Sequence, residues 1–406
     1  MSEPDPLVVV GREFDGFHRS LTTQLATLSD LPARYELVEI SELQSRLIDG
    51  DAATSGAYDV LMVVTDWLPS LIESGKVLPL DGHLTSAAPD GWPDQWVPAL
   101  RELQTGADGR TYGVAYHDGP MLFIYRTDLY GDPAEQAGFA ERFGYPLAVP
   151  ETWDQYRDQA IWFTRPERGL YGTVLAGFPD EHNNVYDFLM HLWSRGGELV
   201  TAEGRSGLDS DSARAAIDFI DDLWHRSRVV DPAAAGWDSV ESGVRFAAGA
   251  GAMMVNWCGF ASLSAAPDSP THGLVGCAPV PGAASRVTMN AYWVLAVPAG
   301  AKDPARSYEL IRRLTTKEMD VVTAQSGGSA TRLDSWADPR VSALAPYYGV
   351  LADAHRDSRS VPVDPRWPEM ALILNDMMIG VIEQRAGHAA LAEAHERLGT
   401  LLDKGL

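Results

Sequence analysis

The first 80 residues alternate between two hydrophobic periodicities, and this alternation limits the possible folds more than any other feature of the chain. Short apolar or alternating runs at 6–11, 34–40 and 58–65 are typical of strands. The segments between them place apolar residues, beginning with Phe17 and Leu21, on one helical face. A strand–helix order repeated three times predicts an α/β fold with a mostly parallel sheet covered by helices.

Several helix ends carry capping signals in the sequence. A Ser, Thr or Asp just before a helical pattern supplies an oxygen for the first backbone N–H groups, and Gly adopts the conformation that ends a helix. Ser41 and Thr152 each precede a Gln at the spacing of a capping box. The predicted caps are Ser41, Thr152, Asp211 and Asp303 at the start of helices, with Pro304 at a first helical position and Gly75 at an end.

The strand predicted at 58–65 ends in an unusual way. Its apolar run is typical of a strand that is buried on both faces, yet Asp66 and Trp67 follow at once. In open α/β sheets, ligands lie beyond the carboxyl ends of strands. We therefore expect Asp66 to accept hydrogen bonds from a ligand and Trp67 to stack on it. The alternatives are that Asp66 caps the helix that begins near 68 and that Trp67 covers the start of that helix.

The same combination of polar and aromatic residues recurs at other predicted strand ends. Trp and Tyr rings suit sites that are apolar but wet, and the chain has 12 Trp and 14 Tyr but only 11 Phe. Rings stack on the C–H faces of sugars, while Asp, Asn and His hydrogen-bond to hydroxyls. The alternative is that these residues serve the core. The candidates are His18, Tyr116, His117, Asp118, Asn256, Trp257, Tyr292 and Trp293. Tyr292 and Trp293 point to opposite faces of one strand, so at most one should reach a ligand.

Length and charge narrow the function. A chain of 406 residues exceeds one ordinary core, so two domains are expected. No linker is evident, which predicts that ordered segments cross between the domains several times. The net charge of −24, without a basic stripe, argues against nucleic acid, and we expect no nucleic-acid partner. No apolar run is long enough to span a bilayer.

No catalytic, metal or nucleotide motif is present. The nucleophile elbow and both glycine-rich nucleotide loops are missing. With 56 acidic residues, a pair of glycosidase carboxylates cannot be singled out. His182 and His191 lack a metal-ligand spacing. Cys258 and Cys277 are compatible with one disulfide or with two thiols. We therefore expect no enzyme activity, no catalytic residue, no metal and no cofactor.

A set of motifs along nearly the whole chain resembles a known family. In order they are "YDVLMVVTDWLPSLIESGKVLPLD", "DGRTYGVAYHDGPMLFIYRTDLY", "VPETWDQY", "RFAAGAGAMMVNWCGF", "NAYWVLAVPAGAKDPARSYELIRRLTT" and "SGGSATR". This order resembles the extracellular solute-binding proteins of ABC importers, in particular the carbohydrate-binding family typified by maltose-binding protein. The last motif ends at Arg332, where the family's loop presents a basic residue, so the resemblance adds Arg332 to the ligand-binding candidates.

The resemblance implies a two-lobe periplasmic-binding-protein-like α/β fold with hinge strands and an interlobe ligand cleft. The first lobe is expected to comprise 1–117 and 257–303. The second, helix-rich lobe is expected to comprise 118–256 and 304–406. The crossings are expected near 116–120, 252–257 and 300–306.

The implied function is binding without catalysis. The chain is expected to capture a monosaccharide or oligosaccharide, as a monomer, and to deliver it to the permease subunits of an ABC transporter. A carbohydrate-active enzyme that uses the same cleft and a cytosolic sugar-responsive binding protein are the alternatives. The location is expected to be extracellular, membrane-associated or periplasmic if a signal peptide was removed, and cytoplasmic if Met1 is the native start.

Overall fold

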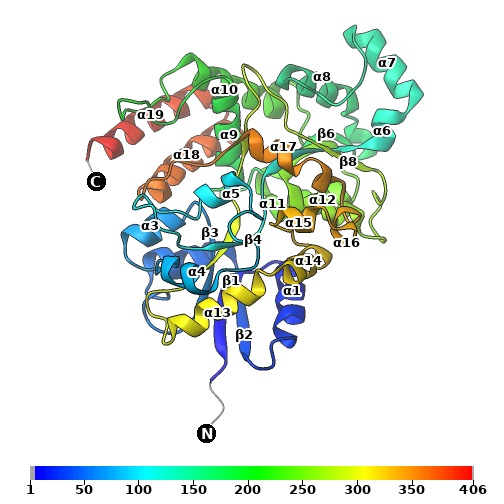
Figure 1. Cartoon of the computed structure of the whole chain (residues 1–406). Coiled ribbons are helices and arrows are strands. Elements are labelled where there is room, and N and C mark those ends of the chain that lie inside the picture. Colours follow the sequence, from blue (N-terminus) through cyan, green and yellow to red (C-terminus); the bar gives the residue numbers. More distant parts are fainter. Residues whose placement is uncertain (1–4, 405–406) are drawn as a thin grey trace. The chain divides into compact units, whose positions relative to one another are not determined.

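The computed structural model describes residues 5–404 and divides the chain into two compact units (Figure 1). Unit 1 contains the described residues up to Pro120, Asn290–Arg356 and Ser360–Trp367. Unit 2 contains Met121–Met289, Asp357–Arg359 and the described residues from Pro368 onward. Each unit is therefore built from segments that lie far apart in the sequence. In the described part of the chain, no helix is long and apolar enough to cross a membrane.

The division into units corrects the predicted lobe boundaries. The first crossing was expected after residue 117 and follows Pro120. Residues 257–289, predicted for the first lobe, belong to unit 2, and residues 304–356 and 360–367, predicted for the second lobe, belong to unit 1. The reason is that the strand ending at Trp257 pairs inside the sheet of unit 2, so the chain returns to unit 1 only after Met289. Residues 1–4 and 405–406 of the predicted lobes lie outside the described residues.

Unit 1 is built on a five-stranded sheet in the order β2-β1-β3-β10-β4. The first three of these strands are mutually parallel, whereas β10 is antiparallel to both β3 and β4. The mostly parallel sheet predicted from the alternating pattern is confirmed. The bounds are β1 Leu7–Arg12, β2 Ala33–Val38, β3 Val60–Val64, β4 Val114–His117 and β10 Trp293–Ala296.

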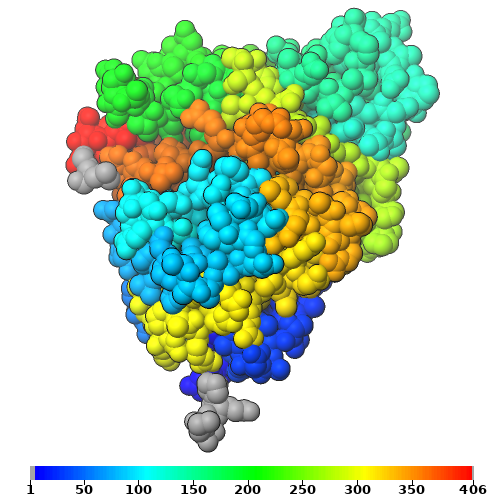
Figure 2. Space-filling view, viewed as in Figure 1, coloured from blue at the N-terminus to red at the C-terminus, as the bar shows by residue number. Residues whose placement is uncertain are grey.

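The central strand β3 is buried along its whole length, as its unbroken apolar run predicts. Helices from two separate stretches of the chain complete unit 1. The surfaces near residues 80–110 (blue to cyan) and 300–350 (yellow to orange) lie directly side by side in Figure 2. The helices are α1 Asp15–Ala26, α2 Ile40–Gln44, α3 Leu68–Glu73, α4 Asp81–Ala87, α5 Pro98–Glu102, α13 Pro304–Leu314, α14 Lys317–Gln325, α15 Leu333–Trp336, α16 Pro339–Ser342 and α17 Leu351–Arg356, with short turns η1 Ser45–Asp49 and η6 Pro346–Gly349.

Unit 2 has a four-stranded sheet in the order β6-β7-β5-β8. Strand β7 is parallel to β6, and β5 is antiparallel to both β7 and β8. The strands are β5 Met121–Arg126, β6 Tyr171–Val174, β7 Gly251–Trp257 and β8 Val275–Ala278, and β9 Thr288–Met289 pairs with β11 Ser358–Arg359.

Helices make up most of the rest of unit 2, and α18 and α19 lie side by side in Figure 1. The helices are α6 Thr127–Gly131, α7 Pro133–Phe143, α8 Trp153–Phe163, α9 Asn183–Ser194, α10 Asp211–Asp221, α11 Ser239–Ala247, α12 Ala261–Ala265, α18 Trp367–Ile382 and α19 Gly387–Asp403, with short turns η2 Pro166–Arg168, η3 Asp222–Arg226, η4 Pro232–Gly236 and η5 Cys258–Phe260.

The capping predictions hold at some helices and fail at others. Thr152 forms a complete capping box with Gln155, and Asp303 accepts from the Arg306 N–H at 3.1 Å. Gly75 follows α3 in the left-handed conformation. The predictions at Ser41 and Asp211 are wrong. The N-cap residues are Glu39 and Ser210 there, because the backbone enters each helix one or two residues earlier than the pattern suggests.

Gly172 permits a close contact between a helix and a strand in unit 2. A β-carbon added to Gly172 on β6 would lie 1.9 Å from the Ala160 carbonyl oxygen on α8. Real β-carbons do not approach backbone that closely, so a side chain here would force α8 away from the sheet. Gly399 in α19 has no heavy atom within 4 Å of the same position.

We predict opposite effects of alanine at these two glycines. Gly172→Ala should lower the free energy of unfolding of unit 2 by about 2 kcal/mol or more, because of overpacking. Gly399→Ala should raise it by about 0.5–1 kcal/mol, because alanine favours a helix interior. Urea unfolding followed by circular dichroism measures both. Equal effects of the two substitutions would contradict the close packing of α8 on β6.

Candidate functional site

The topology of unit 1 brings four strand ends to one edge of the sheet. The carboxyl ends of β1, β3 and β4 meet there, together with the amino end of the antiparallel β10. Trp293 is in register with Val64 on one side and with His117 on the other. This is the edge at which ligands of open α/β sheets bind, so three of the predicted residues, Trp67, His117 and Trp293, are brought together there.

Five rings form a continuous cluster, which we call the unit 1 aromatic edge: Phe14, Phe17, Trp67, His117 and Trp293. Phe17, on α1, is at the centre. Its ring centroid lies 5.0 Å from that of His117, 5.9 Å from Trp293 and 5.1 Å from Phe14. Trp67 contacts Trp293 edge to face at 6.2 Å. Such edge contacts fix the orientation of each ring.

The rings differ in exposure. Trp67 and Trp293 are only 2% and 7% exposed, whereas Phe14 and His117 are partly exposed. Trp67 was expected to stack on a ligand, and in the structure its ring packs against Trp293. Trp67 is also the N-cap residue of α3, so its backbone is fixed by the helix that follows.

His117 is held as a neutral imidazole. Its Nδ1 accepts a hydrogen bond from the Ser329 N–H at 2.9 Å, which requires the proton to sit on Nε2. Burial lowers the pKa of His117 to about 3, and the nearby Arg12 contributes in the same direction. The ring therefore presents one N–H donor at neutral pH, which suits a hydroxyl oxygen.

A small pocket lies beside the end of β3. Its lining includes Thr65, Asp66 and Asn290 together with the segment 360–363. Trp67, and not Asp66, occupies the N-cap position of α3. The Oδ1 atom of Asn290 is buried and has no hydrogen-bond partner among the described residues. A donor that enters this pocket would satisfy Asn290, a residue that the sequence patterns did not single out.

Three other predicted residues of unit 1 use their polar groups inside the fold. The Tyr116 hydroxyl donates to Gln24 Oε1 at 2.8 Å and contacts Ser20 Oγ at 2.9 Å. Tyr292 donates to the Leu100 carbonyl oxygen. Asp118 accepts from its neighbour Gly119 at 2.9 Å, and its other oxygen lies 2.9 Å from His355 Nε2. These contacts correspond to the structural alternative for each residue.

Arg332 also uses the polar groups of its side chain within the protein. Its side chain is 1% exposed and binds both carboxylate oxygens of Asp334, at 2.9 and 3.1 Å. A third nitrogen donates to the carbonyl oxygens of Asp90 and Thr315, and the guanidinium lies 4.8 Å from the centre of the Trp96 ring. The expectation that Arg332 binds the ligand is therefore corrected: it joins the loop after α14 to residues near 90–96.

The corresponding edge of unit 2 contains another ordered indole. Trp257, at the end of β7, is partly exposed and donates from Nε1 to Asn183 Oδ1 at 3.0 Å. Tyr186 packs edge-on against it at 5.6 Å. Asn256 is buried and donates to Ser239 and Ser242, so it holds β7 against α11. Trp257 is thus positioned by α9, a link that no local sequence pattern predicts.

His18 and the two cysteines lie outside the unit 1 aromatic edge. His18 lies exposed on α1 and contacts the Tyr35 hydroxyl at 2.9 Å, away from the ring cluster.

Cys277 carries a free thiol, so it forms no disulfide with Cys258. Burial raises the pKa of the Cys277 thiol to about 12, which makes it a poor nucleophile. Among the described residues, no cluster of His, Cys, Asp and Glu could hold a metal ion.

With this geometry in place, the family can be assigned. The profile of the bacterial extracellular solute-binding proteins matches residues 33–321. The chain belongs to this family of solute-binding proteins, and its members are non-enzymatic. The resemblance found in the sequence is confirmed.

Individual relatives are distant. A protein of Deinococcus radiodurans named "Probable ABC transporter-binding protein" is 26% identical over 319 residues, which cover 76% of this chain and 71% of the relative. A protein of Brucella abortus described as a binding protein is 23% identical over 383 residues, which cover 91% of this chain and 85% of the relative.

Solved structures confirm the two-lobe α/β fold. Maltose-bound MalE3 of T. maritima superposes with a TM-score of 0.85 at 22% identity, covering 98% of this chain and 99% of that one. A ribitol complex of an ABC transporter solute-binding protein from Agrobacterium radiobacter K84 superposes with a TM-score of 0.86 at 20% identity, covering 98% of each chain.

We predict that Arg332→Met destabilises unit 1 by about 3 kcal/mol, because it leaves Asp334 and two carbonyl oxygens without their donor. The measurement is urea unfolding. The matched control is Arg340→Met, which removes an exposed guanidinium paired with Glu318 and Asp338 and should cost about 1 kcal/mol or less. A loss at Arg332 no larger than that at Arg340 would contradict its structural role.

We predict that His117 stays neutral throughout the physiological range. The pKa of His117 is lower in the folded protein than in the unfolded chain, where it is near 6.5. Below that pH the unfolded chain therefore binds more protons than the folded protein. The free energy of unfolding should thus fall as the pH falls from about 6.5 toward 3. Nitrogen NMR should show the Nε2–H tautomer without titration between about pH 5 and 8. Titration near pH 6.5 would show that the ring is not held as described.

Proposed function

We propose that this protein binds a carbohydrate, a sugar or a polyol, at the unit 1 aromatic edge without transforming it chemically. The observation that carries the proposal is the ring cluster at the ligand-binding edge of the sheet, with a donor at His117 and acceptors at Asp66 and Asn290 beside it. Rings that pack on C–H faces and polar groups that bind hydroxyls are what a sugar requires.

Unit 2 supports the same class of ligand independently. Trp257 is partly exposed, and Asn183 and Tyr186 hold its indole in one orientation. A ring that is fixed before the ligand arrives loses little entropy on binding. We propose that Trp257 is a stacking surface of unit 2 for a carbohydrate.

Similar structures support the choice of ligand. Their names mention maltose, ribitol, α-D-tagatose and D-mannitol as bound molecules. We further propose that the chain acts as a monomer outside the cytoplasmic membrane and delivers its ligand to the permease of an ABC importer. The family and the name of the Deinococcus relative support this partner. The alternative of a carbohydrate-active enzyme would require a second carboxylate beside Asp66, and the lining of the described pocket supplies only that one.

The test is a thermal-shift panel of monosaccharides, oligosaccharides and polyols. At least one should raise the melting temperature in a concentration-dependent manner, with a dissociation constant in the micromolar range, or about −8 kcal/mol. Trp67→Ala should abolish this shift, because it removes a wall of the cluster and loosens Trp293. Trp257→Ala should weaken binding at least about tenfold, since it removes one stacking surface.

The control is Trp162→Ala, which removes an indole in unit 2 that bonds to Glu135. It should leave affinity unchanged even if it lowers stability. Recovery of the stabilising sugar unaltered after long incubation distinguishes binding from catalysis. The absence of a shift with every sugar and polyol would contradict the proposal.

A further inference from the structure

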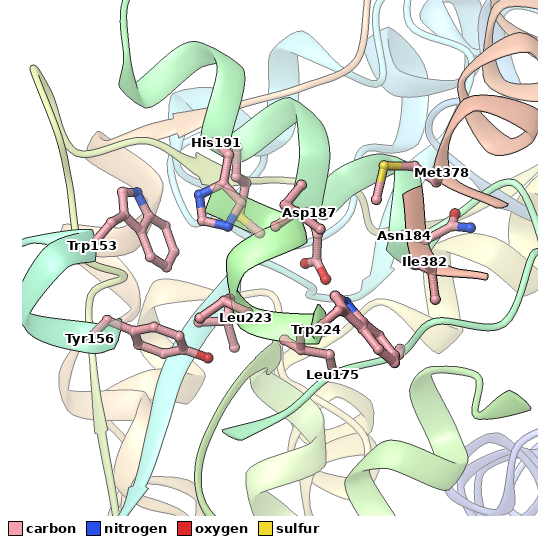
Figure 3. A pocket seen from close by; sticks show the side chains of 14 residues that line it. Trp153, Tyr156, Leu175, Asn184, Asp187, His191, Leu223, Trp224, Met378 and Ile382 are labelled. Carbon is pink, nitrogen blue, oxygen red and sulfur yellow. The ribbon is translucent and has the colours of Figure 1, made fainter. Parts of the chain in front are cut away.

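The enclosed pocket of unit 2 and the edge of the unit 1 sheet differ in what they can hold. The pocket, drawn in Figure 3, is lined by side chains of α8, α9 and α18 among others. Its free space is about the size of one water molecule, which is too small for a sugar. At the edge of unit 1, by contrast, the His117 ring meets the rings of the cluster on one side and the loop 328–332 on the other.

This loop, which we call the His117 loop, is bonded twice to the end of β4. The Ser329 N–H donates to His117 Nδ1 at 2.9 Å, and the Ser329 carbonyl oxygen accepts from the Asp118 N–H at 3.1 Å. Two bonds from one residue to two successive residues fix the direction of the Ser329 N–H. His117 Nδ1 must then be an acceptor, so the ring proton is on Nε2.

Two buried aromatic side chains hold the next residue of the His117 loop. The Ala330 N–H donates to the Tyr348 hydroxyl at 3.2 Å, and the Ala330 carbonyl oxygen accepts from Trp336 Nε1 at 2.7 Å. Tyr348 is 6% exposed and Trp336 is 7% exposed. Because these bonds are shielded from water, breaking them would leave polar groups buried without partners.

Asp320, on α14, holds the far end of the His117 loop and is 3% exposed. Its Oδ1 accepts from the Thr331 N–H at 2.9 Å, and its Oδ2 accepts from the Arg332 N–H at 3.1 Å. Burial raises the pKa of Asp320 to about 6, so the carboxyl group is ionised at pH 7.5 and both oxygens are acceptors. An amide of the same size has only one such oxygen.

Gly328 allows the His117 loop to approach the histidine closely. A β-carbon at this position would lie 2.8 Å from Thr323 Cγ2, 3.0 Å from the Thr323 carbonyl oxygen and 3.3 Å from His117 Nδ1. A side chain would therefore push the loop away from α14 and from β4. Gly328 is thus a position at which the bond to Nδ1 can be loosened without changing His117 itself.

We propose that the His117 loop, with Asp320 as a positioning residue, fixes which nitrogen of His117 carries the proton and so which ligand group His117 recognises. The proposal rests on the carbohydrate function proposed above and adds the group that is recognised, an oxygen that accepts from Nε2–H. The opposite tautomer would present an acceptor to the ligand and would leave the Ser329 N–H without its partner. A donor that is set before the ligand arrives costs little entropy on binding.

The first test compares Gly328→Ala with Gly349→Ala by nitrogen NMR of the full chain at pH 7.5, without any sugar. Gly349 also lies in unit 1 and has no heavy atom within 4 Å of an added β-carbon, so it is the matched control. In the wild type and the control, the Nε2–H form of His117 should exceed the Nδ1–H form at least about tenfold. In Gly328→Ala this ratio should fall at least about threefold, because the Ser329 N–H moves away from the ring.

The second test removes one acceptor of Asp320. Asp320→Asn keeps the size of the side chain and should lower the same ratio at least about threefold. It should also weaken the binding of the stabilising sugar at least about tenfold in calorimetry, because the donor at His117 is no longer set in advance. The matched control is Asp30→Asn, which alters an exposed carboxylate of unit 1 paired with Arg313 at 2.8 Å and should leave both quantities unchanged.

A third measurement needs no variant. The bond from the Ser329 N–H to His117 Nδ1 joins two nitrogens, so ¹⁵N-labelled wild-type protein should show a scalar coupling between them. The absence of this coupling, or an unchanged ratio in Gly328→Ala, would overturn the proposal whether or not a sugar binds. A lowered ratio in Asp320→Asn with unchanged affinity would also overturn it. Failure of every sugar to bind the wild type would instead contradict the carbohydrate function itself.

Discussion

The insertion of β10 between β3 and β4 is the interaction on which the organisation of unit 1 depends. This strand comes from a segment more than 170 residues after β4, and it completes the sheet by antiparallel pairing on both sides. It also places Trp293 between the ends of two parallel strands, where its ring meets Phe17 and Trp67. Without β10, the backbone groups of β4 and those on the β10 side of β3 would lack partners, and the unit 1 aromatic edge would lose Trp293.

The local periodicity of the chain predicted much of this architecture. The strand at 58–65 and its buried character follow from an unbroken apolar run, and the helix caps at Thr152 and Asp303 follow from side-chain chemistry. The lobe boundaries did not follow, because pairing between segments far apart in sequence leaves no local pattern. The strand ending at Trp257 has the composition of any buried strand, and only its partners β5 and β6 assign it to unit 2.

The candidate site shows the same limit at the level of side chains. Sequence placed Trp67, His117 and Trp293 at strand ends, and the topology brings them together. The sequence alone could not distinguish these three residues from Tyr116 and Arg332, whose polar groups are used within the fold. A hydrogen-bonding residue in a buried location is either satisfied by the protein or available to a ligand, and that depends on partners distant in sequence. Phe17, Asn183 and Asn290 were missed for this reason.

The most direct test of the account is a crystal structure of the chain with the sugar that stabilises it most. The account predicts an intact carbohydrate with its C–H face in van der Waals contact with the unit 1 aromatic edge and with hydroxyls within hydrogen-bond distance of His117 or Asp66. A sugar bound elsewhere on the protein, or one found cleaved, would contradict it.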